Sequence, residues 1–208
     1  MRLICPDSRG ETLLARLLAA VAPDERPALE AAACFASRVH APEIDPREGP
    51  YILHPLRVAL IVAEEAGLRE PLWLKVALLH DTQEHDPALP TATLAAVAGS
   101  EAARWSAALA FEHRRNPGVP QAVSLAHYFA GLRAGPPELR IVKMADRLDN
   151  LREAARLGKK KKLAKRLRQE RRDYLPIWDC TDAEAALALK PRIGFFLEEQ
   201  LRSALPPA

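Results

Sequence analysis

The stretch Leu78-Leu79-His80-Asp81-Thr82-Gln83-Glu84-His85 decides the fold of this 208-residue chain. The residues before it are apolar and follow a helical period, whereas His80 and Asp81 are ionisable. Ionisable groups beside so much apolar surface lose hydration, which costs several kcal/mol unless they gain a partner. A metal ion is an economical partner for an imidazole next to a carboxylate. The stretch therefore predicts a helical scaffold that carries a metal ion.

Two other segments supply residues of the same ligand types. His54 directly precedes a proline, which is favoured at the first helical position, so His54 is expected at a helix start. Asp146 lies on a distant helix, with Asn150 one turn later. The set His54, His80, Asp81 and Asp146 suits Mn²⁺, Fe²⁺ or Zn²⁺ better than Mg²⁺ or Ca²⁺. Four protein ligands leave positions for water and substrate, which indicates a catalytic ion.

The composition favours an all-α protein with one domain. Apolar residues make up 49% of the chain, Ala and Leu dominate, and β-branched runs are scarce, as in helical proteins. A chain of this length buries one core well. The apolar period predicts helices over 13–21, 29–39, 55–66, 71–85, 91–97, 102–113, 121–132, 138–157, 160–174 and 182–201, with a loop over 41–50.

The sequence predicts a cytoplasmic protein without membrane contact. No apolar run reaches the roughly 18 residues that span a bilayer, and Arg16 interrupts the apolar segment 13–21 that resembles part of a signal peptide. Three widely spaced cysteines, at positions 5, 34 and 180, indicate reduced thiols rather than a disulfide framework. The oligomeric state stays open.

Three blocks of the chain resemble the hydrolase domain of the RelA/SpoT family and its stand-alone small alarmone hydrolases, which belong to the HD-type metal phosphohydrolases. The blocks are Gly49-Pro50-Tyr51-Ile52-Leu53-His54-Pro55, Ala77-Leu78-Leu79-His80-Asp81-Thr82 and Val142-Lys143-Met144-Ala145-Asp146-Arg147-Leu148-Asp149-Asn150-Leu151-Arg152. The resemblance covers about 28–157. It implies an HD-type helical bundle over 1–157, with a C-terminal helical extension over 158–208 packed on the same domain.

The resemblance also implies an activity and a set of roles. The family uses Mn²⁺ and removes the 3′-diphosphate of guanosine tetra- or pentaphosphate, which yields GDP or GTP and pyrophosphate. Carried over by motif, His54, His80, Asp81 and Asp146 would bind the metal. Glu84 would lie beside the attacking water, and Asn150 would contact the nucleotide near the ribose. Three cations near Asp146 are predicted to offset substrate charge, or else to form surface ion pairs: Lys143, Arg147 and Arg152.

Two positions depart from the family pattern. His85 stands where relatives carry an aspartate beside the catalytic glutamate, so we predict that His85 is a general acid, a further ligand or the sign of a different reaction. The loop 41–50 is shorter than in relatives and offers a single Arg47 in place of the Arg-Lys pair that holds guanine. Arg47 is therefore the predicted nucleotide contact in this loop.

Residues 140–172 contain 14 Lys or Arg against 4 Asp or Glu, a local balance of +10 in a chain whose net charge is +3. The part 159–172 reads as an amphipathic helix with a solvated basic face. Binding of phosphates or nucleic acid is the alternative, although the run lacks the interleaved aromatic residues of a single-strand platform.

Three functions are consistent with these patterns. The leading one is a Mn²⁺-dependent pyrophosphohydrolase that acts on guanosine alarmones, with other divalent transition metals as possible replacements. The second keeps the metal chemistry but acts on an adenine alarmone or another phosphorylated nucleotide. The third is a non-catalytic HD domain that binds a nucleotide or nucleic acid. The full set of metal ligands argues against the third.

Overall fold

A computed structural model describes residue 3 and residues 8–45, 49–111, 118–179, 181 and 184–204. The elements in chain order are α1 (Ser8–Ala19), α2 (Arg26–Val39), β1 (Ile44–Asp45), β2 (Gly49–Pro50), α3 (Leu53–Leu60), the π-helical turn η1 (Ile61–Glu65), α4 (Pro71–Leu79), α5 (Thr82–His85), α6 (Thr91–Ala98), α7 (Ser100–Leu109), α8 (Gln121–Ala134), α9 (Pro137–Arg156), α10 (Lys160–Gln169), the π-helical turn η3 (Glu170–Tyr174), α11 (Leu175–Asp179) and α12 (Glu184–Ala204). The predicted all-α class is confirmed.

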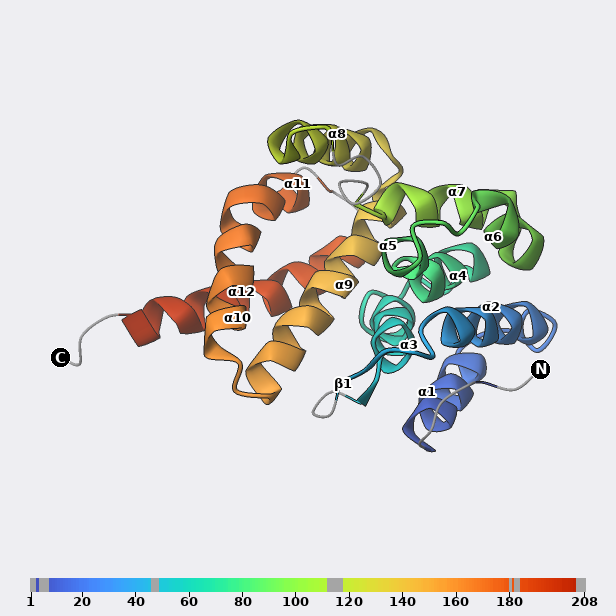
Figure 1. The fold of residues 1–208 in the computed structure, drawn as a ribbon. Coiled ribbons are helices and arrows are strands. Elements are labelled where there is room, and N and C mark those ends of the chain that lie inside the picture. Colours follow the sequence, from blue (N-terminus) through green and yellow to red (C-terminus); the bar gives the residue numbers. More distant parts are fainter. Residues whose placement is uncertain are drawn as a thin grey trace.

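Helix α9 is the central element of the fold. Figure 1 shows it between the N-terminal helices and the C-terminal helices α10–α12, and it contacts α3, α4, α7, α8, α10, α11 and α12. Pro137 occupies its first turn, where the missing N–H has no helical partner to lose. Gly158 follows its end with a φ of +62°, a conformation that favours glycine.

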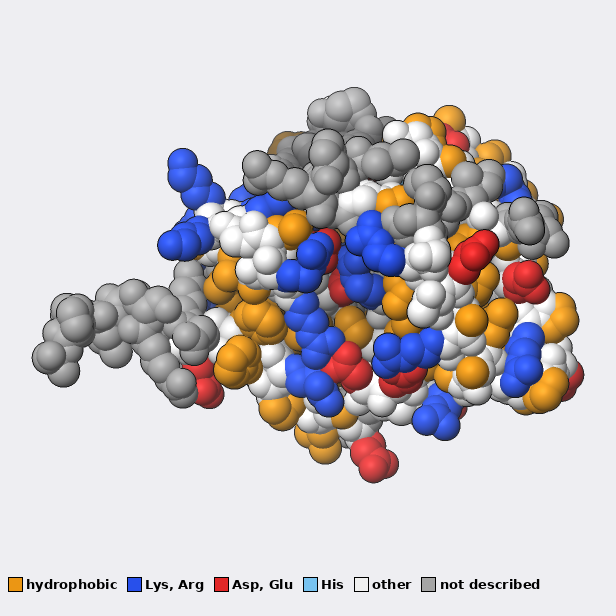
Figure 2. Space-filling view, turned by 90° about the horizontal axis from the view of Figure 1, so that it is seen from below, with side chains coloured by type: hydrophobic (Ala, Val, Ile, Leu, Met, Phe, Trp, Pro, Cys, Tyr) orange, Lys and Arg blue, Asp and Glu red, His pale blue; other side chains and the backbone are white. Residues whose placement is uncertain are grey.

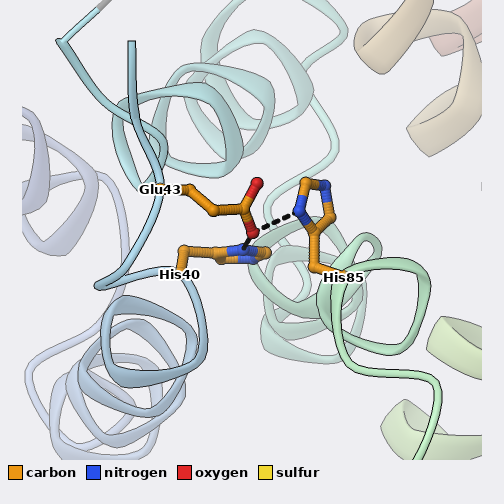
Figure 3. Close-up of side chains that lie close together, drawn as sticks. All are labelled: His40, Glu43 and His85. Atoms are coloured by element: carbon orange, nitrogen blue, oxygen red, sulfur yellow. Dashed lines mark hydrogen bonds and ion pairs between the residues drawn. The ribbon is translucent and has the colours of Figure 1, made fainter.

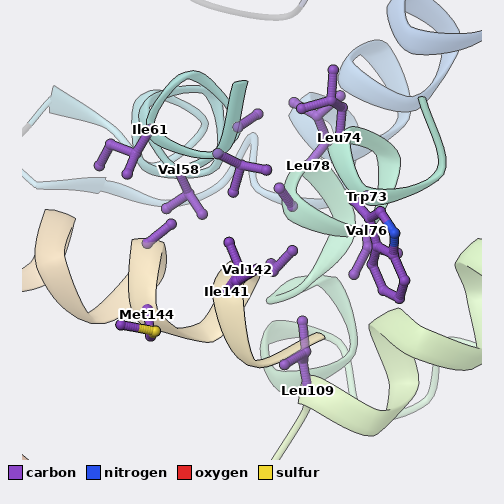
Figure 4. Packing of buried hydrophobic residues seen from close by; sticks show 14 of the residues in the cluster. Val58, Ile61, Trp73, Leu74, Val76, Leu78, Leu109, Ile141, Val142 and Met144 are labelled. Atoms are coloured by element: carbon purple, nitrogen blue, oxygen red, sulfur yellow. The ribbon is translucent and has the colours of Figure 1, made fainter. Parts of the chain in front are cut away.

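The core forms where α3, α4 and α7 meet the apolar side of α9. Figure 4 shows Val58 of α3, Leu78 of α4 and Val142 of α9 directed toward one another. These three side chains are fully buried, and each contributes about 1.5–3 kcal/mol through loss of apolar surface to water. The core therefore fixes the positions of the three helices that carry the predicted metal ligands.

The predicted single helix over 71–85 is wrong in one respect, because the structure divides it at His80 and Asp81. Helix α4 ends at Leu79, and Asp81 caps α5 with φ −98° and ψ −8°. The Thr82 hydroxyl donates a hydrogen bond of 2.7 Å to the Leu79 carbonyl. Such bonds from side chains compete with the backbone hydrogen bonds of a helix. The break turns the Asp81 carboxylate toward the His80 ring.

The predicted loop over 41–50 contains a minimal antiparallel ladder. Ile44 lies opposite Pro50, and Asp45 lies opposite Gly49. Gly49 has a φ of +87°, which glycine adopts without a steric penalty. The predicted nucleotide contact Arg47 lies outside the described residues.

The C-terminal helices pack on α9 rather than standing apart from it. Both α10 and α12 contact α9 (Figure 1). The buried guanidinium of Arg140 on α9 donates to the carbonyls of Leu132, Arg133 and Gly135 at the end of α8 and to the Thr181 hydroxyl. One arginine thus ties the end of α8 and the chain after α11 to the central helix.

The surface mixes charges of both signs. Figure 2 shows Lys and Arg side chains gathered across the face seen from below, with Asp and Glu side chains between them. Among the described residues, no helix combines the length and apolar character that a membrane crossing requires.

Candidate metal centre

The four predicted metal ligands come together from three parts of the fold. His54 lies at the start of α3, His80 and Asp81 lie between α4 and α5, and Asp146 lies on α9. The Nε2 atom of His54 is 3.6 Å from Asp81 Oδ2 and 3.3 Å from Asp146 Oδ1. The Nε2 atom of His80 is 3.2 Å from Asp81 Oδ1 and 3.8 Å from Asp146 Oδ1. Ligand atoms around one transition-metal ion lie about 3–3.5 Å apart, so these distances of 3.2–3.8 Å are close to the spacing that an ion requires.

The other nitrogen of each imidazole is held by a hydrogen bond. His54 Nδ1 lies 2.7 Å from Asp149 Oδ2, and His80 Nδ1 lies 2.8 Å from the Ala77 carbonyl oxygen. Arg57 in turn donates two hydrogen bonds to the Asp149 carboxylate. Such partners fix the tautomer of a metal-binding histidine. Both Nε2 atoms are therefore directed toward the carboxylates.

The buried charges of the centre depend on one another. Burial disfavours a charged His54, but the carboxylates of Asp146 and Asp149 outweigh burial and raise its pKa to about 9. Burial likewise opposes ionisation of Asp81, yet the His80 imidazole holds the pKa of Asp81 below its ordinary value. The Nε2 atom of His80 is buried, and no residue that the structure describes forms a hydrogen bond with it. A divalent ion between the four side chains would satisfy that atom and the carboxylates together.

Sequence reasoning missed Tyr51, although it lies in the same block as His54. The Tyr51 hydroxyl donates a hydrogen bond to Asp81 Oδ2, and its ring lies 5.6 Å from that of His54, measured between centroids. The position three residues before His54 at the start of a helix was the available signal. Tyr51 therefore orients one of the predicted ligands.

A cavity of about 480 Å³ opens beside the four side chains. Its lining includes both carboxylates of the centre, Asp81 and Asp146, together with Glu84. Glu84 Oε1 accepts a hydrogen bond of 2.8 Å from the Phe111 N–H. Burial raises the pKa of the Glu84 carboxyl, which moves it toward the range in which a carboxylate accepts a proton well. Glu84 thus has the placement of a base next to the metal centre.

Three of the predicted substrate contacts lie at this cavity: Lys143, Arg147 and Asn150. The Lys143 Nζ atom is 2.8 Å from Asp146 Oδ2, and Asn150 Nδ2 donates to Asp146 Oδ1 over 2.6 Å. Arg147 forms a buried ion pair with Glu170 of η3. The fourth, Arg152, is paired with Glu65 and lines a different cavity. For Arg152 the geometry favours the predicted alternative of an ion pair.

The structure directs His85 away from the cavity. His85 is not among the described residues that line the cavity, whereas Tyr51 is. The ring of Tyr51 packs against His85, with 4.3 Å between the two ring centroids. The Nδ1 atom of His85 forms a hydrogen bond with the Glu43 carboxylate. Of the roles predicted for His85, this placement favours a ligand over a proton donor.

The basic segment 159–172 contributes two arginines to the cavity lining, which favours the predicted alternative of phosphate binding for part of the segment. Its lysines at 160, 161, 162 and 165 are exposed, as a solvated face requires. Arg166, however, donates to both the backbone carbonyl and the side-chain oxygen of Asn150, and Arg166 and Arg172 line the cavity. The helical period could not reveal the contact between Arg166 and Asn150, because that contact depends on how α10 packs against α9.

The all-α fold and the cluster of His54, His80, Asp81 and Asp146 are those expected of an HD-type metal hydrolase, and comparisons with known proteins show this family. A protein from Homo sapiens called guanosine-3′,5′-bis(diphosphate) 3′-pyrophosphohydrolase MESH1 is 35% identical over 128 residues, which cover 60% of this chain and 68% of the relative. The Mus musculus protein of that name is 34% identical with the same coverage. No family model matches the chain.

A solved structure shares the fold. It is described as a metazoan ortholog of SpoT that hydrolyzes ppGpp, and it superposes with a TM-score of 0.56 at 18% identity, covering 94% of this chain and 97% of the other. At that identity the likeness concerns the fold alone. The chain belongs to the HD-type hydrolase family represented by the MESH1 pyrophosphohydrolases.

The hydrogen bond between Asp149 and His54 allows a test of the metal centre. We expect Asp149→Asn to weaken metal binding by about 10- to 100-fold, since partners that orient a ligating histidine contribute that much. Equilibrium dialysis with Mn²⁺ measures the change. Glu153→Gln is the matched control, because Glu153 also pairs with Arg57, at 3.4 Å, but makes no contact with His54 in the described ion pairs. Equal affinities for the two variants would contradict this role of Asp149.

Proposed function

We propose that the protein is a Mn²⁺-dependent pyrophosphohydrolase that removes the 3′-diphosphate of guanosine tetra- or pentaphosphate, with GDP or GTP and pyrophosphate as products. The observation that carries the proposal is the set His54, His80, Asp81 and Asp146 beside a cavity whose lining also includes Lys143 and three arginines. The activity printed in the names of the MESH1 relatives supports the choice of substrate.

The side chains around the cavity have different roles in the proposed hydrolysis. A divalent ion held by the four ligands supplies Lewis acidity and makes water a better nucleophile at neutral pH. Glu84 orients the attacking water and accepts its proton, since its carboxylate borders both the ligands and the cavity. Lys143 offsets charge that develops on the phosphoryl oxygens. Burial opposes the charge on Lys143, but Asp146 outweighs it, so that the pKa of Lys143 lies well above its ordinary value and the amine stays a cation.

The remaining walls suit a phosphorylated nucleotide. Arg147, Arg166 and Arg172 are the arginines of the lining, and guanidinium groups bind phosphate oxygens well. Besides Tyr51, the lining has four aromatic members that offer surfaces for a base or a ribose: Phe111, Tyr128, Phe129 and Tyr174. Residues of α10 and η3 line the same cavity as residues of α9, so this part of the C-terminal extension contributes to the proposed substrate site.

A nucleotide panel tests the proposal. Purified full-length chain with Mn²⁺ is incubated with guanosine tetraphosphate, its adenine counterpart, GTP and ATP, and the phosphate products are separated by ion-exchange chromatography. We expect pyrophosphate and GDP from guanosine tetraphosphate and no pyrophosphate after removal of metal by a chelator. Orthophosphate as the main product, or no turnover of a guanosine alarmone, would overturn the proposal. Preference for the adenine counterpart would transfer the same chemistry to a different nucleotide.

A further inference from the structure

A second cluster of metal-binding residue types lies on the other side of Tyr51. It consists of His40 after the end of α2, Glu43 in the following turn and His85 at the end of α5. One nitrogen or oxygen atom from each residue lies within 4.8 Å of those of the other two. Figure 3 shows both imidazole rings directed toward the Glu43 carboxylate. Glu43 Oε1 is 3.7 Å from His40 Nδ1 and is hydrogen-bonded to His85 Nδ1.

His40 is the unusual member of this cluster. It is only 2% exposed, and neither of its ring nitrogens has a hydrogen-bond partner among the described residues. Leaving a buried polar group unsatisfied costs about 1–3 kcal/mol. Burial, reinforced by the neighbouring His85, lowers the pKa of His40 to about 3, so its imidazole is neutral at neutral pH. A neutral buried imidazole with a vacant lone pair beside a carboxylate is well suited to bind a metal ion.

We propose that His40, Glu43 and His85 form a second metal site, which binds a borderline divalent transition-metal ion such as Zn²⁺. Two imidazole nitrogens and one carboxylate oxygen are the donor set such an ion prefers, and three protein ligands leave room for water. An ion at this site satisfies His40 and replaces the contact between His85 and Glu43. The ion has a route from solvent, because the Glu43 side chain is 38% exposed and that of His85 is 19% exposed.

The second site is distinct from the HD centre but close to it. Tyr51 lies between the two: its ring centroid is 4.8 Å from that of His40 and 5.6 Å from that of His54, while its hydroxyl donates to Asp81. The two sites share no ligand. The proposal therefore does not depend on the proposed substrate, and each site can be removed without removing a ligand of the other.

Zn²⁺ stoichiometry tests the proposal. The full chain is stripped with a chelator and equilibrated with Zn²⁺ by dialysis, and the bound metal is measured by mass spectrometry. We expect about two ions per chain for the parent, about one for Glu43→Gln and about one for Asp81→Asn, which weakens the HD centre. The combination of both changes is expected to bind none. Glu43→Gln preserves the size of a partly exposed side chain, so it keeps the test independent of folding.

Two further measurements fix the location of the second ion. Co²⁺ bound to Asp81→Asn is expected to give visible absorption bands that His40→Ala or Glu43→Gln removes, with at least about a 100-fold loss of affinity, more than changes to supporting residues cause. His127→Ala removes an exposed histidine outside the cluster and is expected to retain both ions. A parent chain that binds one ion, or a Glu43→Gln variant that binds as many as the parent, would overturn the second site.

Discussion

Asp81→Asn is expected to reduce kcat/KM for guanosine tetraphosphate by about 1,000-fold or more. The change removes the negative charge from a side chain that lies within 3.2–3.6 Å of both ligating imidazoles. A neutral amide is a poor ligand for a transition-metal ion, and a catalytic ion supplies several kcal/mol of transition-state stabilisation. Each 1.36 kcal/mol corresponds to about a tenfold change in rate. Release of pyrophosphate at saturating Mn²⁺ gives the measurement.

Asparagine has nearly the shape of aspartate, and its side-chain oxygen can still accept the hydrogen bond from the Tyr51 hydroxyl. The fold is therefore expected to persist. Circular dichroism and thermal unfolding check this. Asp24→Asn makes the same chemical change at an exposed position between α1 and α2 and is expected to keep the activity of the parent. If Asp81→Asn and Asp24→Asn turned over substrate equally fast, the assignment of the metal centre would fail.

Glu84→Gln is expected to lower kcat by about 100- to 10,000-fold while metal binding stays within about threefold of the parent. General-base catalysis contributes rate factors of that size. Glutamine retains an oxygen that can accept the 2.8 Å hydrogen bond from the Phe111 N–H, so the side chain keeps its position. It cannot take a proton from water, because the amide is not basic. Steady-state kinetics and Mn²⁺ dialysis on the same preparation separate the two effects.

Glu101→Gln is the matched control for Glu84, since Glu101 is exposed in the first turn of α7. It is expected to leave both kcat and metal affinity unchanged. A Glu84→Gln variant that lost the metal would place Glu84 among the ligands, and one that kept full activity would show that another group accepts the proton.

The parts of the structure that the sequence predicted are those with local signals. The helical period marks most helices, and prolines at helix starts mark where α4 and α9 begin. His54 and the pair His80-Asp81 stand in short distinctive blocks, so their meeting in space was predictable. The break between α4 and α5 was not, because it arises from side-chain hydrogen bonds of His80 and Thr82 to preceding carbonyls.

The residues that sequence reasoning missed act through contacts between distant segments. Asp149 reaches His54 across 95 positions, and Glu43 reaches His85 across 42. Arg166 was predicted as part of a solvated face, yet it binds Asn150 on α9. No periodicity encodes such pairings, since they depend on which faces of two helices meet after packing. His85 was noticed as a departure, but its direction could only come from the fold.

The contact between Arg166 and Asn150 has a consequence for the effect of substitutions in α10. The predicted metal ligands belong to the first three quarters of the chain, while part of the cavity lining belongs to α10 and η3. The cavity lining is therefore drawn from both stretches, since α9 carries Lys143 and Arg147 and α10 carries Arg166. Because Arg166 is hydrogen-bonded to Asn150, and Asn150 donates to Asp146, a substitution of Arg166 is expected to affect the predicted metal centre as well as the cavity. The shape of the cavity and the geometry of the predicted metal centre are therefore expected to change together.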